Sequence, residues 1–162
     1  MYRIGHSHDT HRIVKDRQLI LGGITIPYEF GLLGHSDADV VLHVVAESII
    51  GALGLGDLGM LFPDTDLQYQ NLASEIFVIE VMKLAKKAGY QVENIDITIF
   101  LEKPHLNNYK EAMKNNLSKL LETKNVNIKA TRGEGLGFIG RMEGISASAV
   151  VLMKSNPRFE KL

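Results

Sequence analysis

Residues 95–101 read Ile95-Asp96-Ile97-Thr98-Ile99-Phe100-Leu101, and this stretch decides which kind of fold the chain can form. Its apolar side chains alternate with Asp96 and Thr98, and a period of two is typical of a β-strand that buries one face. We expect the strand to cover 94–102. Phe100 lies on the face opposite the isoleucines, which indicates that both faces of the strand need cover.

Further elements are predicted on both sides of this strand, and their order defines the fold class. In chain order they are a strand at 2–14, a hairpin at 18–27 that turns at Gly22-Gly23, a loop at 31–37, a helix from near Asp37 to Leu53, helices at 71–88 and 109–121, and strands at 126–130 and 145–153. Ser36 or Asp37 is expected to cap the first helix, and Gly54 to end it. This order predicts an α+β protein, a ferredoxin-like two-layer sandwich with a mainly antiparallel sheet and helices on one face.

Length and composition narrow the class of protein. The 162 residues are expected to form one domain over 1–156, followed by a flexible tail at 157–162. The net charge of −1 argues against a nucleic-acid or anionic-membrane partner attracted by bulk charge. No cysteine is present, which excludes disulfides and thiolate metal sites. The N-terminus shows no signal peptide and no apolar run reaches membrane-spanning length, so we expect a cytoplasmic protein.

The strongest chemical signal is a set of three possible metal ligands. Asp9 and His11 are two residues apart in a predicted strand and therefore share one face, while His43 belongs to the helix that follows. One carboxylate and two imidazoles form the ligand set of a zinc site that keeps a position open, where a diphosphate oxygen could bind. This set favours a metal-dependent enzyme that acts on a phosphorylated small molecule. The alternative is that the histidines are ordinary surface or core residues.

The segment before His43 adds two further candidates, each with two interpretations. Asp39 precedes His43 by four residues and can meet it on one helix face, either to orient the imidazole or simply to favour the helix N-terminus. His35 and Ser36 lie where free backbone amides attract anions. They either hold a phosphate there or form a capping loop.

Two glycine-rich blocks follow, at 54–66 and 131–141. In the first block Asp57 and the aspartates near its end are either turn formers or ligands for substrate and a hydrated cation. In the second block Glu134 could bind a hard divalent ion between phosphates, or it could pair with Arg132 on the surface. The glycine spacing of the second block matches neither a Rossmann fingerprint nor a P-loop.

Four motifs resemble those of a known family. They read Arg3-Ile4-Gly5-His6-x-x-Asp9-x-His11-Arg12, Gly34-His35-Ser36-Asp37-x-Asp39-x-x-x-His43, Leu55-Gly56-Asp57-x-Gly59-x-x-Phe62-Pro63-Asp64-Thr65-Asp66 and Leu136-Gly137-Phe138-x-Gly140-Arg141-x-Glu143-Gly144. In this order, over residues 2–154, they resemble the 2-C-methyl-D-erythritol 2,4-cyclodiphosphate synthases of non-mevalonate isoprenoid biosynthesis. The resemblance implies a lyase that converts 4-diphosphocytidyl-2-C-methyl-D-erythritol 2-phosphate to the cyclic diphosphate and CMP. Two other functions stay open: a non-catalytic homologue that binds cytidine nucleotides or isoprenoid diphosphates, and a different metal phosphohydrolase.

The resemblance also implies roles for individual residues. Asp9, His11 and His43 would bind Zn²⁺ or another divalent transition metal, with Asp9 and His11 also near the substrate. Glu134 would hold Mg²⁺ or Mn²⁺ on the substrate diphosphate, and His35 would be catalytic. The remaining substrate contacts implied are Ser36, Asp57, Gly59, Phe62, Asp64 and Asp66 around the methylerythritol phosphate, and Pro104, Ala130, Thr131 and Arg132 around the cytidine.

The family assembles as a homotrimer with active sites between neighbouring subunits, which the resemblance implies here as well. Phe138, Arg141 and Glu143 would then surround the threefold axis. In the family this region can hold an isoprenoid diphosphate, with the arginine on the diphosphate and the phenylalanine on the prenyl chain. The alternative is that these residues only hold the trimer together.

Three positions depart from the family pattern. Arg132 replaces the second of two threonines, the one thought to stabilise the transition state, so we expect an arginine to take a catalytic position. The family's Gln-x-Pro-Lys reads Glu102-Lys103-Pro104-His105. His8 stands where an apolar aromatic residue is usual, and adds a titratable group close to the metal strand.

Overall fold

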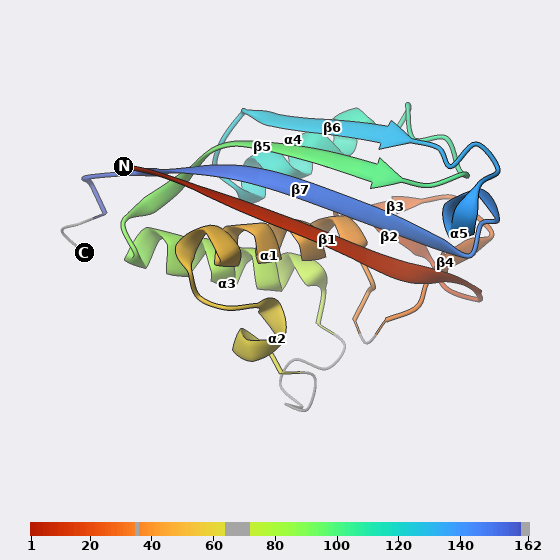
Figure 1. Ribbon diagram of the computed structural model, residues 1–162, viewed down its shortest axis with the longest axis horizontal. Coiled ribbons are helices and arrows are strands. Elements are labelled where there is room, and N and C mark those ends of the chain that lie inside the picture. The colour runs from red at the N-terminus through yellow and green to blue at the C-terminus, as the bar shows by residue number, and fades with distance from the viewer. Residues whose placement is uncertain (35, 64–71, 160–162) are drawn as a thin grey trace.

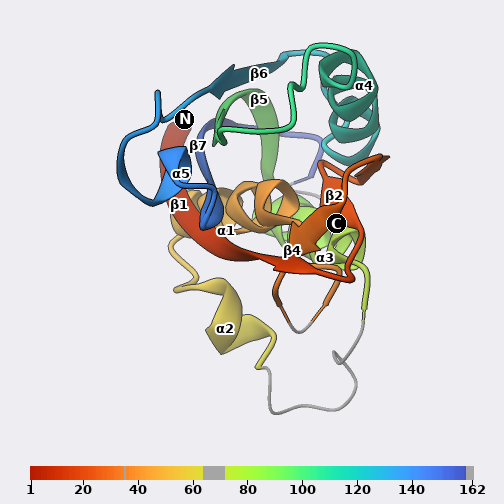
Figure 2. The ribbon, with the colours of Figure 1, turned by 90° about the vertical axis from the view of Figure 1, so that its right-hand side faces the viewer.

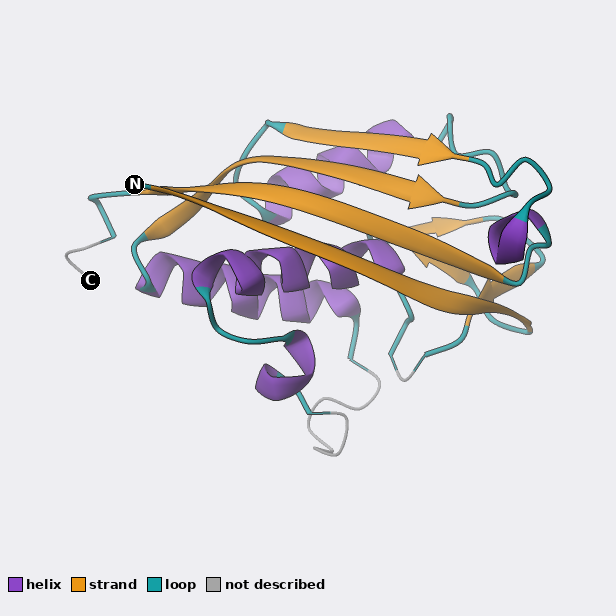
Figure 3. Ribbon diagram, in the orientation of Figure 1, coloured by secondary structure: helices purple, strands orange, loops and turns teal. Residues whose placement is uncertain are grey.

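The computed structural model describes residues 1–34, 36–63 and 72–159, and these residues form two layers (Figure 1). In chain order the elements are β1 (Tyr2–Lys15), β2 (Leu19–Leu21), β3 (Ile24–Ile26), β4 (Phe30–Leu32), α1 (Val40–Leu53), α2 (Leu58–Leu61), α3 (Ser74–Lys87), β5 (Tyr90–Phe100), α4 (Lys110–Leu120), β6 (Val126–Thr131), α5 (Gly137–Gly140) and β7 (Gly144–Ser155). Figure 3 shows the sheet as one layer, with the long helices beneath it. The predicted α+β sandwich is confirmed.

The main sheet has the strand order β4-β1-β7-β5-β6. β1 and β7 pair antiparallel along most of their length, from Tyr2 opposite Lys154 to Arg12 opposite Gly144. Among the described strands, β5 and β6 are the one parallel pair, so the sheet is mainly antiparallel, as predicted. β2 and β3 form a separate hairpin that turns at Gly22-Gly23, also as predicted.

One face of the sheet is buried against the helices. Figure 2 shows that the sheet curves, and that α1, α3 and α4 lie on the same side of it. Ile95, Ile97 and Ile99 of β5 are at most 1% exposed and form the centre of the core, which is the face that their alternation predicted. α1 is apolar almost all round because it lies between the sheet and α3.

Several details differ from the prediction, in two element boundaries and two additional short elements above all. α1 begins at Val40 with Asp39 as its cap, three residues later than expected, because the Asp39 carboxylate accepts the amides of Val41 and Leu42. Part of the expected loop at 31–37 is the strand β4, which pairs with the end of β1 and is too short to show alternation. The glycine-rich connection contains the short helix α2. β5 begins at Tyr90, before the clear alternation starts.

Two expectations about the rest of the chain can be compared with the structure. The predicted tail at 157–162 lies partly outside the described residues, which end at 159. Within the described ranges, none of the helices combines the length and apolar character needed to cross a membrane.

Candidate active site

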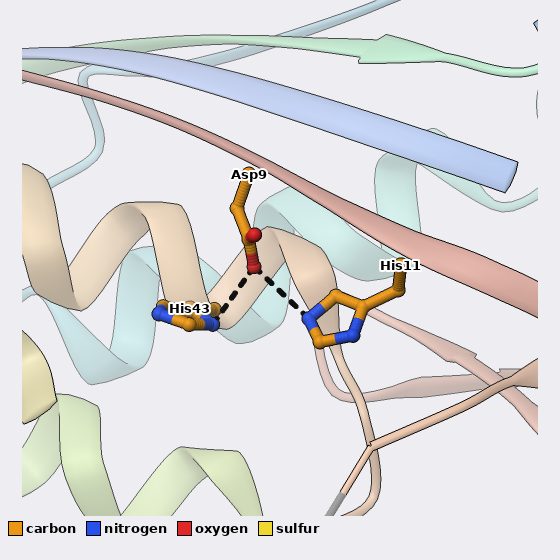
Figure 4. A group of neighbouring side chains, drawn as sticks. All are labelled: Asp9, His11 and His43. Atoms are coloured by element: carbon orange, nitrogen blue, oxygen red, sulfur yellow. Dashed lines mark ion pairs between the residues drawn. The ribbon is translucent and has the colours of Figure 1, made fainter.

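Asp9, His11 and His43 converge between β1 and α1 (Figure 4). The Oδ2 atom of Asp9 lies 2.9 Å from Nε2 of His11 and 2.9 Å from Nδ1 of His43. Asp9 and His11 share the inner face of β1, while His43 is on the first turn of α1, so two elements build the site as predicted. All three side chains are partly buried.

The three ligand atoms suit a metal ion. Oδ2 of Asp9 is buried, and no hydrogen bond of good geometry reaches it even though two imidazole nitrogens lie 2.9 Å away. A cation between these three ligand atoms would satisfy all of them at once. Zinc bonds of about 2.0–2.1 Å place tetrahedral ligand atoms roughly 3.3 Å apart, which is close to the spacing here.

The charges of Asp9 and His11 stabilise each other. Burial raises the pKa of Asp9, but the His11 and His43 imidazoles outweigh this effect and hold the pKa well below its ordinary value. Burial likewise lowers the pKa of His11, but Asp9 and the Leu33 carbonyl together raise it above its ordinary value. Because a ligating imidazole is neutral, a cation that binds here must displace protons.

The backbone selects the nitrogen that His11 offers. Its Nδ1 lies 2.9 Å from the carbonyl oxygen of Leu33, just after β4, so Nδ1–H donates there and, when the ring is neutral, the Nε2 lone pair faces Asp9. Asp9 is oriented by its Oδ1 atom, which accepts the amide of Thr10 at 2.7 Å.

A pocket of about 210 Å³ opens beside the ligand set. His11 and His43 line it together with three residues that the resemblance placed at the substrate: Ser36, Gly59 and Phe62. The other lining residues are Gly34, Ala38, Asp39, Leu42, Leu58, Ser74 and Phe77. Most of this lining is apolar, with a few polar groups at one end, which is typical of small-molecule sites.

Asp39 lies at this pocket as a structural anchor. It is 1% exposed and accepts four backbone N–H groups, from Gly22, Gly23, Val41 and Leu42. It therefore ties the β2–β3 turn to the start of α1. The interpretation that Asp39 orients His43 is wrong, because that imidazole contacts Asp9 and Glu47 instead.

Arg17 is a residue that sequence reasoning missed. Its guanidinium donates to the backbone oxygens of Gly34 at 2.8 Å and Ser36 at 2.6 Å, and so holds both sides of the loop that leads into α1. The Ser36 hydroxyl accepts the amide of Ala38. A single arginine in a polar turn carries no periodic signal, so only its contacts reveal the role.

A second pocket, of about 110 Å³, lies at the end of β5 and β6. Its lining includes Pro104, Ala130, Thr131 and Arg132, the residues expected around cytidine. The Arg132 guanidinium donates to Oε1 of Glu102 at 2.7 Å, and the other oxygen of Glu102 accepts the amide of Gly133. The alternative pairing of Arg132 with Glu134 is wrong, because the ion pair of Arg132 is with Glu102.

Other predicted residues lie apart from both pockets or outside the described chain. Glu134 is exposed on the loop between β6 and α5 and does not line either pocket. Arg141 pairs with Glu143 at 2.8 Å beside the exposed ring of Phe138. Asp57 caps α2 through the amide of Met60, which fits its interpretation as a turn former. His35, Asp64 and Asp66 lie outside the described residues.

An α+β sandwich with a carboxylate and two imidazoles converging at a pocket has the architecture of a metal-dependent enzyme for small molecules. The model of the YgbB family matches residues 2–154. A 2-C-methyl-D-erythritol 2,4-cyclodiphosphate synthase of Geobacillus sp. (strain WCH70) is 51% identical over 156 residues, which are 95% of this chain and 99% of that protein.

Solved structures agree with these relatives. The Plasmodium falciparum IspF CDP complex superposes with a TM-score of 0.84 at 32% identity, over 96% of this chain and 97% of the other. The bifunctional IspDF of Campylobacter jejuni superposes with a TM-score of 0.91 at 37% identity, over 96% of this chain but 42% of that longer protein. The chain belongs to the YgbB family.

Proposed function

We propose that this chain is a 2-C-methyl-D-erythritol 2,4-cyclodiphosphate synthase, a phosphorus–oxygen lyase of isoprenoid biosynthesis. The observation that carries the proposal is the convergence of Asp9, His11 and His43 beside a pocket, in a chain 51% identical to a synthase of that name. The substrate would be 4-diphosphocytidyl-2-C-methyl-D-erythritol 2-phosphate, and the products the 2,4-cyclodiphosphate and CMP.

The chemistry needs no nucleophile from the protein. The 2-phosphate of the substrate attacks the β-phosphorus of its own diphosphate, the bond from that phosphorus to the oxygen bridging the two phosphates breaks, and CMP leaves. The protein therefore has to fold the substrate and stabilise charge. Leu42, Leu58 and Phe62 offer an apolar wall to the carbon chain, and the Ser36 hydroxyl offers a polar contact at the same pocket.

Two cations would share the charge. Asp9, His11 and His43 would hold Zn²⁺ or another divalent transition metal, and Glu134 would hold Mg²⁺ or Mn²⁺ on the diphosphate. Bound cations of this kind neutralise charge that develops on phosphoryl oxygens. His35 and Arg132 would act on the transferring phosphoryl group. In support of this role, Arg132 lines the second pocket, with Glu102 fixing its direction.

We propose that the active unit is a homotrimer. In the described part of the chain, the metal pocket and the pocket at the end of β5 and β6 share no lining residue, so one substrate spanning both is easiest to accommodate between two subunits. The outer face of the sheet exposes Tyr2, Ile4 and Val150 at 58%, 71% and 46%, apolar surface that a neighbouring subunit could cover. Light scattering that shows a fully active monomer would contradict this assembly.

Phosphorus NMR tests the activity directly. Pure protein with the substrate, Zn²⁺ and Mg²⁺ is expected to yield the cyclic diphosphate and CMP. No turnover would instead indicate a homologue that only binds cytidine nucleotides or isoprenoid diphosphates. Release of free phosphate would indicate a phosphohydrolase.

Metal analysis tests the ligand set. His11→Ala and His43→Ala are expected to lose zinc and activity and to keep the fold. His6→Ala is the matched control for zinc occupancy alone, because His6 lies on the same strand but on the opposite face, 3.1 Å from the Ser148 hydroxyl and in the surface that the proposed trimer would cover. Full zinc occupancy in both ligand variants would show that the assignment is wrong.

Two roles fit the segment from Phe138 to Glu143, which leads from α5 into β7. An isoprenoid diphosphate would place its phosphates on Arg141 and its prenyl chain on Phe138, whereas a purely structural role needs only the observed pair of Arg141 with Glu143. Arg141→Ala is expected to weaken binding of geranyl diphosphate in the first case alone.

A further inference from the structure

Glu47 lies beside the metal ligands but is not one of them. It follows His43 by one helical turn on α1, and its Oε2 atom is 3.6 Å from Nε2 of His43. The same oxygen accepts a hydrogen bond of 3.2 Å from the hydroxyl of Ser7, which is 6% exposed on β1. Ser7, Asp9 and His11 alternate along the inner face of β1, so this strand supplies two of the three ligands and the hydroxyl that holds Glu47.

The geometry of His43 explains why this carboxylate matters. Its Nδ1 faces Oδ2 of Asp9 at 2.9 Å and is therefore the nitrogen that would bind an ion held by Asp9, while Nε2 lies on the far side of the ring (Figure 4). A neutral imidazole carries one proton, and a free lone pair on Nδ1 requires that proton on Nε2. A carboxylate next to Nε2 favours this tautomer.

The two ligand imidazoles are thus oriented in opposite senses. His11 turns Nε2 toward Asp9 and has its Nδ1 at the Leu33 carbonyl. His43 turns Nδ1 toward Asp9, and within the described residues Glu47 is the acceptor that faces its Nε2. The 3.6 Å between Oε2 of Glu47 and Nε2 of His43 is too long for a good hydrogen bond, so Glu47 acts on this nitrogen through its charge, and Ser7 anchors the carboxylate.

We propose that Glu47 is a positioning residue that selects the Nδ1-binding tautomer of His43, and that Ser7 holds Glu47 in place. The pair raises the affinity of the site for a divalent transition metal. This inference rests on the part of the proposed function that places a metal on Asp9, His11 and His43. It does not depend on the identity of the substrate.

Zinc affinity of the purified protein tests the proposal. After removal of metal, the dissociation constant for Zn²⁺ is measured by competition with a chromogenic chelator. Glu47→Ala is expected to weaken binding about 10- to 100-fold, the usual effect of removing such a partner. Glu47→Gln, which keeps the shape of the side chain but removes its charge, is expected to lose most of the same affinity, and Ser7→Ala to lose less than Glu47→Ala.

Two further measurements separate positioning from a structural role. Nitrogen NMR of the zinc-loaded protein is expected to show His43 bound through Nδ1 with Nε2 protonated in the wild type, and a share of rings bound through Nε2 in Glu47→Ala. Thermal unfolding of the metal-free variants is expected to match the wild type, because the Glu47 side chain is 29% exposed. Glu80→Gln, which breaks the exposed pair with Lys83 on α3, is the matched control and should change neither affinity nor tautomer.

The outcomes are distinguishable. If wild-type zinc binding depends on His43 but Glu47→Ala binds as tightly as the wild type, or His43 is found to bind through Nε2, the positioning role is overturned and the proposed function stands. If the wild type binds no zinc, both are overturned. If zinc binding depends on Glu47 but the substrate is not cyclised, the positioning role stands and the proposed activity fails.

Discussion

Replacing Gly5 by alanine is a sharp test of how β1 packs on α1. Gly5 is buried on the inner face of β1, and a Cβ atom there would lie 1.8 Å from the carbonyl oxygen of Ser48 and 2.8 Å from the amide nitrogen of Ala52. Both neighbours are backbone atoms of α1 and cannot rotate away. The strand and the helix would therefore have to separate by more than about 1 Å to reach a normal contact distance.

The expected loss of stability is large. Overpacking of a core typically costs about 1–3 kcal/mol, and a clash with backbone on the opposing element belongs at or above the upper end. We expect Gly5→Ala to lower the free energy of unfolding by about 3 kcal/mol or more, out of a total of roughly 5–15 kcal/mol for a domain. Zinc affinity should fall too, because the same separation pulls Asp9 and His11 away from His43.

Urea denaturation of the metal-free protein, at one fixed protein concentration, measures the change. Gly51→Ala on the same helix is the matched control, because its added Cβ would meet no atom within 4 Å. An exposed glycine inside a helix costs about 0.5–1 kcal/mol relative to alanine, so this variant should be stabilised by that amount. A Gly5→Ala protein within about 0.5 kcal/mol of the wild type would refute the described packing of β1 on α1.

Three further predictions concern charge. Asp39→Ala should cost about 3 kcal/mol or more in urea denaturation, because it removes a helix cap and leaves buried amides of the β2–β3 turn without an acceptor. Burial raises the pKa of Asp39 in the folded protein from 3.8 to about 6 against the effect of those amides, so the folded state binds more protons than the unfolded state in this range. Wild-type stability should therefore fall, relative to Asp39→Asn, as the pH rises from about 4 to about 6, and an identical pH profile would contradict this. Arg132→Thr should leave steady-state turnover equal or higher, because threonine is the residue that the family uses at this position; a fall of more than about tenfold, about 1.4 kcal/mol, would show that a threonine cannot replace the arginine in this chain. When the pH is lowered, zinc affinity should begin to fall before pH 6.5 is reached, because the pKa of His11 in the metal-free protein is raised above that value. If the midpoint of the loss of zinc affinity lies well below pH 6.5, the ion pair between His11 and Asp9 is contradicted.

Local pattern was enough to predict the main elements. The alternation of 95–101 marked the central strand and its buried face, since side-chain direction in a strand depends only on position. The spacing of Asp9 and His11 placed both on one face for the same reason. The glycine after Leu53 marked the end of α1, because its positive φ of 72° suits a residue without a side chain.

Boundaries and orienting contacts could not be predicted in the same way. Ser36, Asp37 and Asp39 are all acceptable caps by residue type, and Asp39 became the cap because its carboxylate also reaches the amides of the β2–β3 turn. β4 is a strand because the end of β1 offers it a partner. A pattern of three residues carries no period from which to infer this.

The sequence by itself determined which residue types could bind a metal, and the face of β1 on which two of them lie. Only the tertiary structure decided how they are aimed: the Leu33 carbonyl at Nδ1 of His11, and Glu47, anchored by Ser7, at Nε2 of His43. The physical reason is that periodicity records the direction of a side chain relative to its own backbone. The atoms that hold these rings come partly from residues distant in the chain, which approach only when β4 pairs with β1 and when the sheet packs on α1.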